Sequence, residues 1–159
     1  MYIAPVSLDE DRQGVWDRRF LRLAKEIATW SKDPSTQVGA IAVRGRDIIA
    51  TGYNGFPARL KDSTDLLNDR DQKIPRTVHA EQNVVSIAAR KGSPLEGASI
   101  YVYPWHPCPE CAKLLIQSGF SEVIHAKTDV PERWSGAFAL ANAMFAEAGV
   151  VVKEIKLED

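Results

Sequence analysis

The fold is decided by residues 79–127, which run HAEQNVVSIAARKGSPLEGASIYVYPWHPCPECAKLLIQSGFSEVIHAK. Residues 79–91 and 109–118 predict helices, and a glycine follows each of them, as it does at many helix ends. Residues 98–103 and 122–127 are short apolar runs that predict buried strands. Helices and strands that alternate in this way indicate right-handed crossovers and a partly parallel sheet.

Toward the N-terminus, residues 14–31 predict an amphipathic helix that ends before Pro34. Residues 37–43 and 47–52 are two apolar runs separated by a short turn, so they predict a β-hairpin. Residues 53–78 are polar and weakly patterned, which predicts a long loop of functional importance. The apolar stripe of the first helix recurs at spacings of three and four and consists of Trp16, Phe20, Leu23, Ile27 and Trp30.

Toward the C-terminus, the sequence predicts one more helix and one more strand. Trp134, Phe138, Ala141 and Phe145 form the apolar face of that helix, and residues 150–155 form the strand. The whole pattern predicts five strands in a mixed sheet with helices on both faces. We therefore expect a single domain over residues 1–159, with a three-layer α/β/α architecture.

Composition excludes several classes of protein. The 159 residues carry a formal charge of −1, which disfavours a dedicated DNA or RNA binder. The first 14 residues contain no apolar run typical of a signal peptide, and no stretch is apolar enough to cross a bilayer. We therefore expect a cytoplasmic protein without a membrane partner. Its only two cysteines lie three positions apart, which in a reducing compartment favours metal or redox chemistry.

Three residues form a candidate metal site: His79, Cys108 and Cys111. His79 stands at the start of the helix predicted over residues 79–91, and Cys108 and Cys111 stand at the start of the helix predicted over residues 109–118. The positive end of a helix favours the thiolate form of cysteine that a metal requires. Zinc binds cysteine sulfur and histidine nitrogen in tetrahedral geometry. A structural zinc site has four protein ligands, whereas a catalytic site leaves one position for water. A set of three ligands therefore predicts a catalytic zinc site.

Glu81 stands two residues after His79, close to any ion that this histidine binds. A carboxylate beside water activated by zinc can accept its proton and pass it to a substrate nitrogen. The alternative is a first-turn glutamate that only stabilises the helix dipole. The combination of H-x-E with P-C-x-x-C is the pattern of zinc deaminases. We therefore predict that Glu81 is the catalytic residue.

Other interpretations of these motifs remain open. Cys108 and Cys111 also fit a redox pair or two small core residues. Neither of these roles would use His79 or Glu81. His106 would be a fourth ligand that closes the site, and His125 fits a core or edge histidine inside an apolar strand. A non-catalytic zinc-binding subunit would use the same ligands, although it would need no glutamate there.

Four stretches of the chain carry a family resemblance: WSKDPSTQVGA at 30–40, GYNGFP at 52–57, HAEQN at 79–83 and PCPECAK at 107–113. With them the chain resembles the deoxycytidylate (dCMP) deaminases of the cytidine deaminase superfamily. The last two stretches are shared across that superfamily, whereas the first two narrow the resemblance to dCMP deaminases and close relatives. The resemblance implies the cytidine deaminase-like fold and zinc-dependent hydrolysis of dCMP to dUMP, a precursor of thymidylate.

The resemblance also implies roles for single residues. Glu81 would carry a proton from the attacking water to N3 of cytosine, and would then protonate the departing amine. The backbone N–H of Ala80 would bind the pyrimidine carbonyl, and Asn54 would hydrogen-bond the sugar, although Asn-Gly is also ordinary turn chemistry. His106 stands where many relatives carry other residues, close to the expected base pocket. A substrate with a modified base therefore remains an open alternative.

The phosphate of a nucleotide requires basic side chains or backbone N–H groups. Lys32, within the first family stretch, and Arg76, just before the HAE motif, are the candidates. Arg59, Lys61 and Lys73 in the long loop cannot be separated from them by sequence.

Further expectations concern zinc content, assembly and substrate. Residues 56–78, where many family members carry ligands for a second zinc ion, contain no cysteine or histidine, so we expect one zinc ion per chain. The resemblance suggests a homo-oligomer, commonly a hexamer, and dCTP or dTTP as allosteric effectors. The main rival substrates are a modified pyrimidine nucleotide, a nucleoside or free base, and a base in tRNA. Near-neutral charge disfavours tRNA, and GYNGFP favours a deoxynucleotide.

Overall fold

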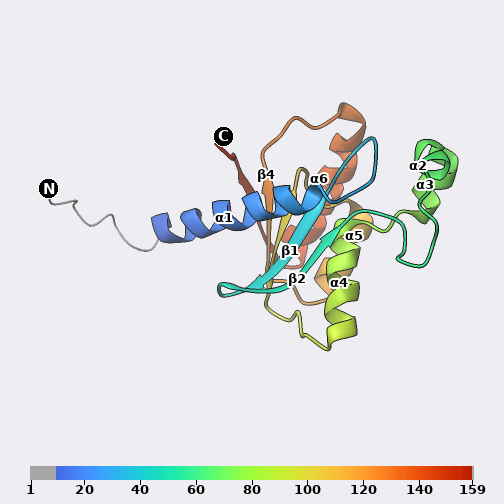
Figure 1. Cartoon of the computed structure of the whole chain (residues 1–159). Coiled ribbons are helices and arrows are strands. Elements are labelled where there is room, and N and C mark those ends of the chain that lie inside the picture. The colour runs from blue at the N-terminus through green and yellow to red at the C-terminus, as the bar shows by residue number, and fades with distance from the viewer. Residues whose placement is uncertain (1–9, 159) are drawn as a thin grey trace, which may run out of the picture.

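The computed structural model describes residues 10–158, which form six helices and five strands (Figure 1). The helices are α1 (Glu10–Ala28), α2 (Thr64–Asn68), α3 (Arg70–Arg76), α4 (Ala80–Lys91), α5 (Pro109–Gln117) and α6 (Glu132–Glu147). The strands are β1 (Gly39–Arg44), β2 (Asp47–Tyr53), β3 (Ser99–Tyr103), β4 (Glu122–Ala126) and β5 (Val151–Ile155). None of the described helices is long and apolar enough to cross a membrane.

The strands form one mixed sheet in the order β2-β1-β3-β4-β5. β1 pairs antiparallel with both β2 and β3, whereas β3, β4 and β5 run parallel. The parallel part follows from the chain order, because α5 and α6 each connect one strand to the next. The predicted five-stranded mixed sheet is confirmed.

Helices cover both faces of this sheet, which confirms the three layers. On one face α1 packs Phe20 and its apolar neighbours against Ile41. On the other face α4, α5 and α6 form a second core that contains Leu115 and Phe145. Successive side chains of a strand point to opposite faces, so Ala42 of β1 joins this second core while Ile41 joins the first.

Two glycines let helices lie directly on the strands. A Cβ added at Gly39 would collide with the carbonyl oxygen of Ala24 in α1. A Cβ added at Gly52 would lie 2.5 Å from the carbonyl oxygen of Ala80, the first residue of α4. The absence of a side chain at Gly52 therefore sets how closely the start of α4 approaches β2, and the HAE motif lies at that start.

The first helix differs from the prediction at both ends. It begins at Glu10 and ends at Ala28, so Trp30 is not on its apolar face but 55% exposed in the turn that follows. The helix ends before Ser31, its predicted last residue, because the Ser31 hydroxyl donates a hydrogen bond to the carbonyl oxygen of Asn54 at 2.8 Å. The Trp30 ring contacts Tyr53 edge to face instead.

The segment predicted as a long loop contains two short helices. Figure 1 shows α2 and α3 together, to one side of the sheet. Asp69 separates them, and its carboxylate accepts hydrogen bonds from the backbone N–H groups of Asp71 and Gln72, which caps α3. With five and seven residues, both helices are too short for an apolar period to identify them.

Candidate active site

His79 is fixed at the N-terminus of α4. It is the residue before the first helical turn and has extended backbone angles. Its backbone N–H donates to the Gln82 side chain at 2.8 Å, and its carbonyl accepts from the Asn83 N–H at 2.9 Å. These two backbone hydrogen bonds fix His79 at the N-terminus of α4.

The two cysteines are fixed at the N-terminus of α5 in the same way. Cys108 is the residue before the helix and Pro109 is its first residue, where a missing N–H costs nothing. The carbonyl of Cys108 accepts from the N–H of Ala112 at 2.8 Å. Cys111 follows in the first turn and is buried. Both sulfur atoms therefore lie at the positive end of one helix.

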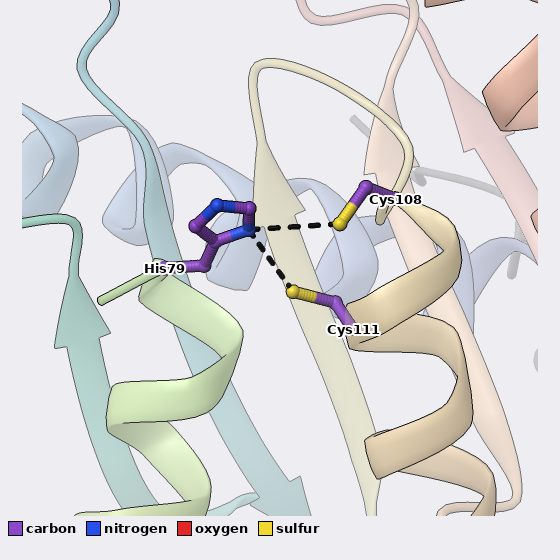
Figure 2. Close-up of side chains that lie close together, drawn as sticks. All are labelled: His79, Cys108 and Cys111. Carbon is purple, nitrogen blue, oxygen red and sulfur yellow. Dashed lines mark hydrogen bonds between the residues drawn. The ribbon is translucent and has the colours of Figure 1, made fainter. Parts of the chain in front are cut away.

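The three predicted ligands lie together, as Figure 2 shows, with His79 facing both sulfur atoms. Nδ1 of His79 is 3.3 Å from Sγ of Cys111 and 3.6 Å from Sγ of Cys108. A tetrahedral zinc ion with ordinary bond lengths separates a sulfur and a nitrogen ligand by about 3.6 Å. The geometry and the donor types therefore fit one zinc ion. Among residues 10–158 no fourth side chain joins this group, so one coordination position stays open.

The cluster is electrostatically prepared for a cation. Hydrogen bonding from the Cys111 thiol lowers the pKa of Cys108 to about 4, and the same contact raises the pKa of Cys111. The hydrogen bond to Cys108 also raises the pKa of His79. A bound cation favours the deprotonated form of both thiols.

Glu81 lies beside this cluster and is only 5% exposed. Its Oε2 accepts the Cys111 thiol at 3.6 Å. Burial raises the pKa of its carboxyl group, because the charged form loses water. A carboxylate with a raised pKa at a metal site is the arrangement expected of a group that accepts and returns a proton.

A cavity of about 240 Å³ opens over the cluster and Glu81. One wall is aromatic and consists of Trp105, His106, Trp134 and Phe138. The first two come from the loop between β3 and α5, and the last two come from the start of α6. This volume is slightly below the usual range of small-molecule sites, so the cavity suits one small ligand.

Three basic side chains also line this cavity: Arg70, Lys73 and Arg133. Lys73 is buried, and its ammonium pairs with Asp33 at 3.0 Å. Arg70 and Arg133 are exposed, and neither forms an ion pair with another residue of the described chain.

The two predicted phosphate ligands do not line this cavity. Lys32 faces outward and pairs with Asp62 at 2.7 Å. Arg76 donates to the carbonyl and the side-chain oxygen of Gln72, one turn earlier in α3, at 2.9 and 2.6 Å. In both cases a nearby acceptor holds the side chain away from the cluster, a local arrangement that the sequence motif does not reveal.

The three other predicted contacts do line the cavity: Asn54, Ala80 and His106. The Asn54 side chain also organises its loop, since its oxygen accepts from Val38 N–H at 2.8 Å and its amide donates to Thr36 at 2.9 Å. His106 is buried beside the ligand group and is not part of it. The His125 ring contacts the His106 ring and is buried, and its Nδ1 bonds to the Ala126 carbonyl, so of the two predicted places, core or edge, His125 occupies the core.

The cavity residues that sequence reasoning did not assign to the site include Arg70, Arg133, Trp134 and Phe138. The apolar period of the sequence places Trp134 and Phe138 only on the apolar face of a helix. A usable signal was the topology, because ligands of open α/β sheets bind beyond the carboxyl ends of the strands. The loop after β4 starts at the carboxyl end of that strand, and Arg133 and Trp134 follow it in the first turn of α6.

Comparison with known proteins agrees with this site. Residues 15–127 match the family described as the cytidine and deoxycytidylate deaminase zinc-binding region. An uncharacterized deaminase in the luxG 3' region of Aliivibrio fischeri is 39% identical over 145 residues, which cover 90% of this chain and 95% of the relative. The deoxycytidylate deaminase of Mus musculus is 38% identical over 147 residues, which cover 87% of this chain and 79% of the relative.

The fold also matches a solved structure, the dCMP deaminase of cyanophage S-TIM5 in complex with dCMP and dUMP. The TM-score is 0.72 at 23% identity, and the match covers 93% of this chain and 99% of that one. At this identity the likeness concerns the fold. The matched family, the relatives and the His-Cys-Cys cluster agree, so the chain belongs to the cytidine and deoxycytidylate deaminase family and is a zinc-binding deaminase.

Proposed function

We propose that this enzyme hydrolyses dCMP to dUMP and ammonia, with Glu81 as the residue that moves the protons. The observation that carries the proposal is the position of Glu81: its buried carboxylate lies 3.6 Å from a ligand of the metal cluster and lines the same cavity. A non-catalytic zinc site would leave that buried carboxyl group without a purpose.

His79, Cys108 and Cys111 would hold the zinc ion. When bound, zinc lowers the pKa of its water to about 7. Glu81 would accept a proton from the attacking water and deliver it to N3 of the cytosine. Glu81 would then take up the proton of the hydroxyl group added at C4 and pass it to the amine as the C4–N bond breaks and ammonia leaves. Its burial excludes bulk water, and the raised pKa of its carboxyl group makes it a stronger base than an exposed glutamate.

The relatives named deoxycytidylate deaminase support dCMP as the substrate. The cavity supplies the groups that a nucleotide needs. Ala80 opens α4, and its backbone N–H is one of the helix-start donors without a partner inside the helix, so it would bind the pyrimidine carbonyl. Asn54 retains a second amide hydrogen, which would bind the sugar.

For the phosphate we propose Arg70 and Arg133 in place of Lys32 and Arg76. Both arginines line the cavity and make no ion pair within the described chain, whereas Lys32 and Arg76 already have partners outside it. A guanidinium can bind a phosphate through two parallel hydrogen bonds. Lys73 would act indirectly, since it is paired with Asp33.

The test compares the zinc-loaded wild type with Glu81→Gln, and follows ammonia release and dUMP formation from dCMP. Loss of the proton carrier should lower kcat by roughly 10²–10⁴-fold. Metal analysis should find about one zinc ion per chain in both proteins. A variant that stays fully active would exclude the role of Glu81. A wild type that leaves dCMP unchanged, with and without dCTP, would exclude the substrate.

We also propose that the enzyme works in the cytoplasm as a homo-oligomer, with a hexamer as the expected assembly, and responds to dCTP and dTTP. The family resemblance in residues 30–40 and 52–57 supports these expectations. Light scattering of the purified protein gives the subunit number, and dCMP titrations with each triphosphate measure the regulation.

A further inference from the structure

Residues 31–38 lie between α1 and β1 and form neither helix nor strand. They belong to the first of the four family stretches, yet the proposed function gives none of their side chains a direct task. Several of them line the cavity: Asp33, Ser35, Thr36 and Val38. A loop has no ladder of backbone hydrogen bonds, so other groups must satisfy its backbone and fix its shape.

Asn54, which follows the last residue of β2, is bound to this loop through both its backbone and its side chain. Its backbone N–H donates to the Val38 carbonyl at 3.2 Å, and its backbone carbonyl accepts from the Ser31 hydroxyl at 2.8 Å. Its side-chain oxygen accepts from the Val38 N–H at 2.8 Å, and its side-chain amide donates to the Thr36 carbonyl at 2.9 Å. The position of Asn54 therefore depends on the loop.

The chemistry of these partners decides which way the Asn54 amide faces. The Val38 N–H can only donate, so it meets the amide oxygen, and the Thr36 carbonyl can only accept, so it meets the amide nitrogen. The amide group is planar, so the bond to Thr36 also fixes the direction of the second amide hydrogen. No described residue accepts that hydrogen. It is the donor that the proposed function assigns to the sugar.

Ser31 joins the loop to the backbone of Asn54, and it is buried, with 4% exposure. Its hydroxyl group donates to the Asn54 carbonyl and accepts from the Asp33 N–H at 3.2 Å. Its own carbonyl accepts from the Gln37 side chain at 2.6 Å. Only a group that both donates and accepts can make the two hydroxyl bonds at once, which an alanine at this position could not do.

We propose that Ser31 is a positioning residue: its hydroxyl group holds the backbone of Asn54, and so places the second amide hydrogen of Asn54 for the sugar of the substrate. Ser31 itself is not among the residues that line the cavity. The proposal rests on the proposed function, which assigns that hydrogen to the sugar. In dCMP the only sugar hydroxyl is at C3′, so the effect of Ser31 should be confined to substrates that carry this group.

The test compares kcat/KM of the zinc-loaded proteins for dCMP and for 2′,3′-dideoxy-CMP, which lacks that hydroxyl group. We expect wild type to prefer dCMP by about tenfold or more, as sites that bind a substrate hydroxyl do. Asn54→Ala should lose this preference, and Ser31→Ala should reduce it by about threefold or more, within the range of one hydrogen bond. Thr29→Val is the matched control, because the Thr29 hydroxyl donates to the Glu26 carbonyl in α1 at 2.6 Å and not to Asn54.

The preference for dCMP separates positioning from stability. A variant that merely folds less well turns over both substrates more slowly by the same factor, because less active enzyme is present. An unchanged preference in Ser31→Ala would therefore overturn the proposal, even if both rates fall. An unchanged preference in Asn54→Ala, or no turnover of dCMP by wild type, contradicts the proposed function instead, and exchange of the Asn54 side-chain amide then decides the inference.

That exchange is measured by NMR on zinc-loaded wild type and Ser31→Ala, with the Asn54 amide signals assigned by their absence in Asn54→Ala. Without the Ser31 hydroxyl, we expect these hydrogens to exchange with water about threefold faster or more, since the bond to Thr36 opens more often. The Asn68 amide, which donates to the Thr64 carbonyl in α2, is the internal control and should exchange equally in both proteins. Equal exchange of the Asn54 amide in the two proteins would show that Ser31 does not position it.

Discussion

At the scale of single residues, two buried histidines pack against each other at the active site. The rings of His106 and His125 meet edge to face with centroids 5.1 Å apart. Burial lowers the pKa of both imidazoles from the ordinary value of 6.5, so both are held neutral in the folded protein. Each Nδ1 bonds to a backbone carbonyl, of Pro107 and Ala126 respectively. Their protonation therefore opposes folding.

The pH dependence of stability follows from the sign of these shifts. The folded pKa of His125 lies below 6.5, the value of the unfolded chain, so its contribution is complete above about pH 6.5 and is lost as the pH falls. In His125→Asn, where the amide can replace the Nδ1 donor, the slope of unfolding free energy against pH should be smaller by up to about 1.4 kcal/mol per pH unit. Urea unfolding of both zinc-loaded proteins between pH 7.5 and 5 measures the difference. Parallel curves would show that His125 does not titrate on unfolding.

The metal ligands and Glu81 could be predicted because each depends on a short local motif at a helix start. His79 and Glu81 are two positions apart, and Cys108 and Cys111 are three positions apart. At the start of a helix, these spacings place the side chains of each pair close together. The basic side of the cavity could not be predicted in this way. Arg70 and Arg133 come from distant segments, and only the three-dimensional fold brings them to one cavity.

At the scale of elements, the contact between β2 and α4 positions one of the three metal ligands, His79, together with Glu81. Gly52 lies against the first turn of α4, where an added Cβ would also lie 2.9 Å from the backbone nitrogen of Val84. The helix backbone cannot yield as a flexible side chain would. Any side chain at Gly52 must therefore displace the N-terminus of α4, which carries His79 and Glu81.

Gly52→Ala should destabilise the protein by roughly 1–3 kcal/mol, the usual cost of overpacking, and should weaken zinc retention. Gly136→Ala is the matched control, since an added Cβ in α6 meets nothing within 4 Å and alanine favours a helix by about 0.5–1 kcal/mol. Thermal unfolding and zinc competition with a chelator measure both effects. Equal behaviour of the two variants would show that the contact does not position α4.

The regular strands and the longer helices could be predicted because each carries a clear apolar period. α2 and α3 could not, since five and seven residues span less than two helical turns each. Their positions depend on a cap at Asp69 and on a distant ion pair, neither of which is an apolar pattern.

At the scale of the whole molecule, residues 56–78 form a side wall of the cavity that is attached to the sheet at few points. Gly55 and Val78 join through a pair of backbone hydrogen bonds at its base. Farther out, Lys73 of α3 donates to Asp33 and to Ser35 at 3.0 and 3.2 Å. The Lys73–Asp33 pair is the buried link between this segment and the loop that follows α1, with both side chains 10% exposed.

Lys73→Met should release this segment, because it leaves the Asp33 carboxylate buried without its cation. Breaking a buried pair in this way costs about 3 kcal/mol or more. The Lys32–Asp62 pair joins the same two regions but is exposed, so Lys32→Met should change little and serves as the control. Hydrogen exchange should show faster exchange at residues 64–77 in Lys73→Met alone, with a higher KM for dCMP because Arg70 loses its position. If both variants exchange like the wild type, the segment is held by its backbone contacts and the buried pair is dispensable.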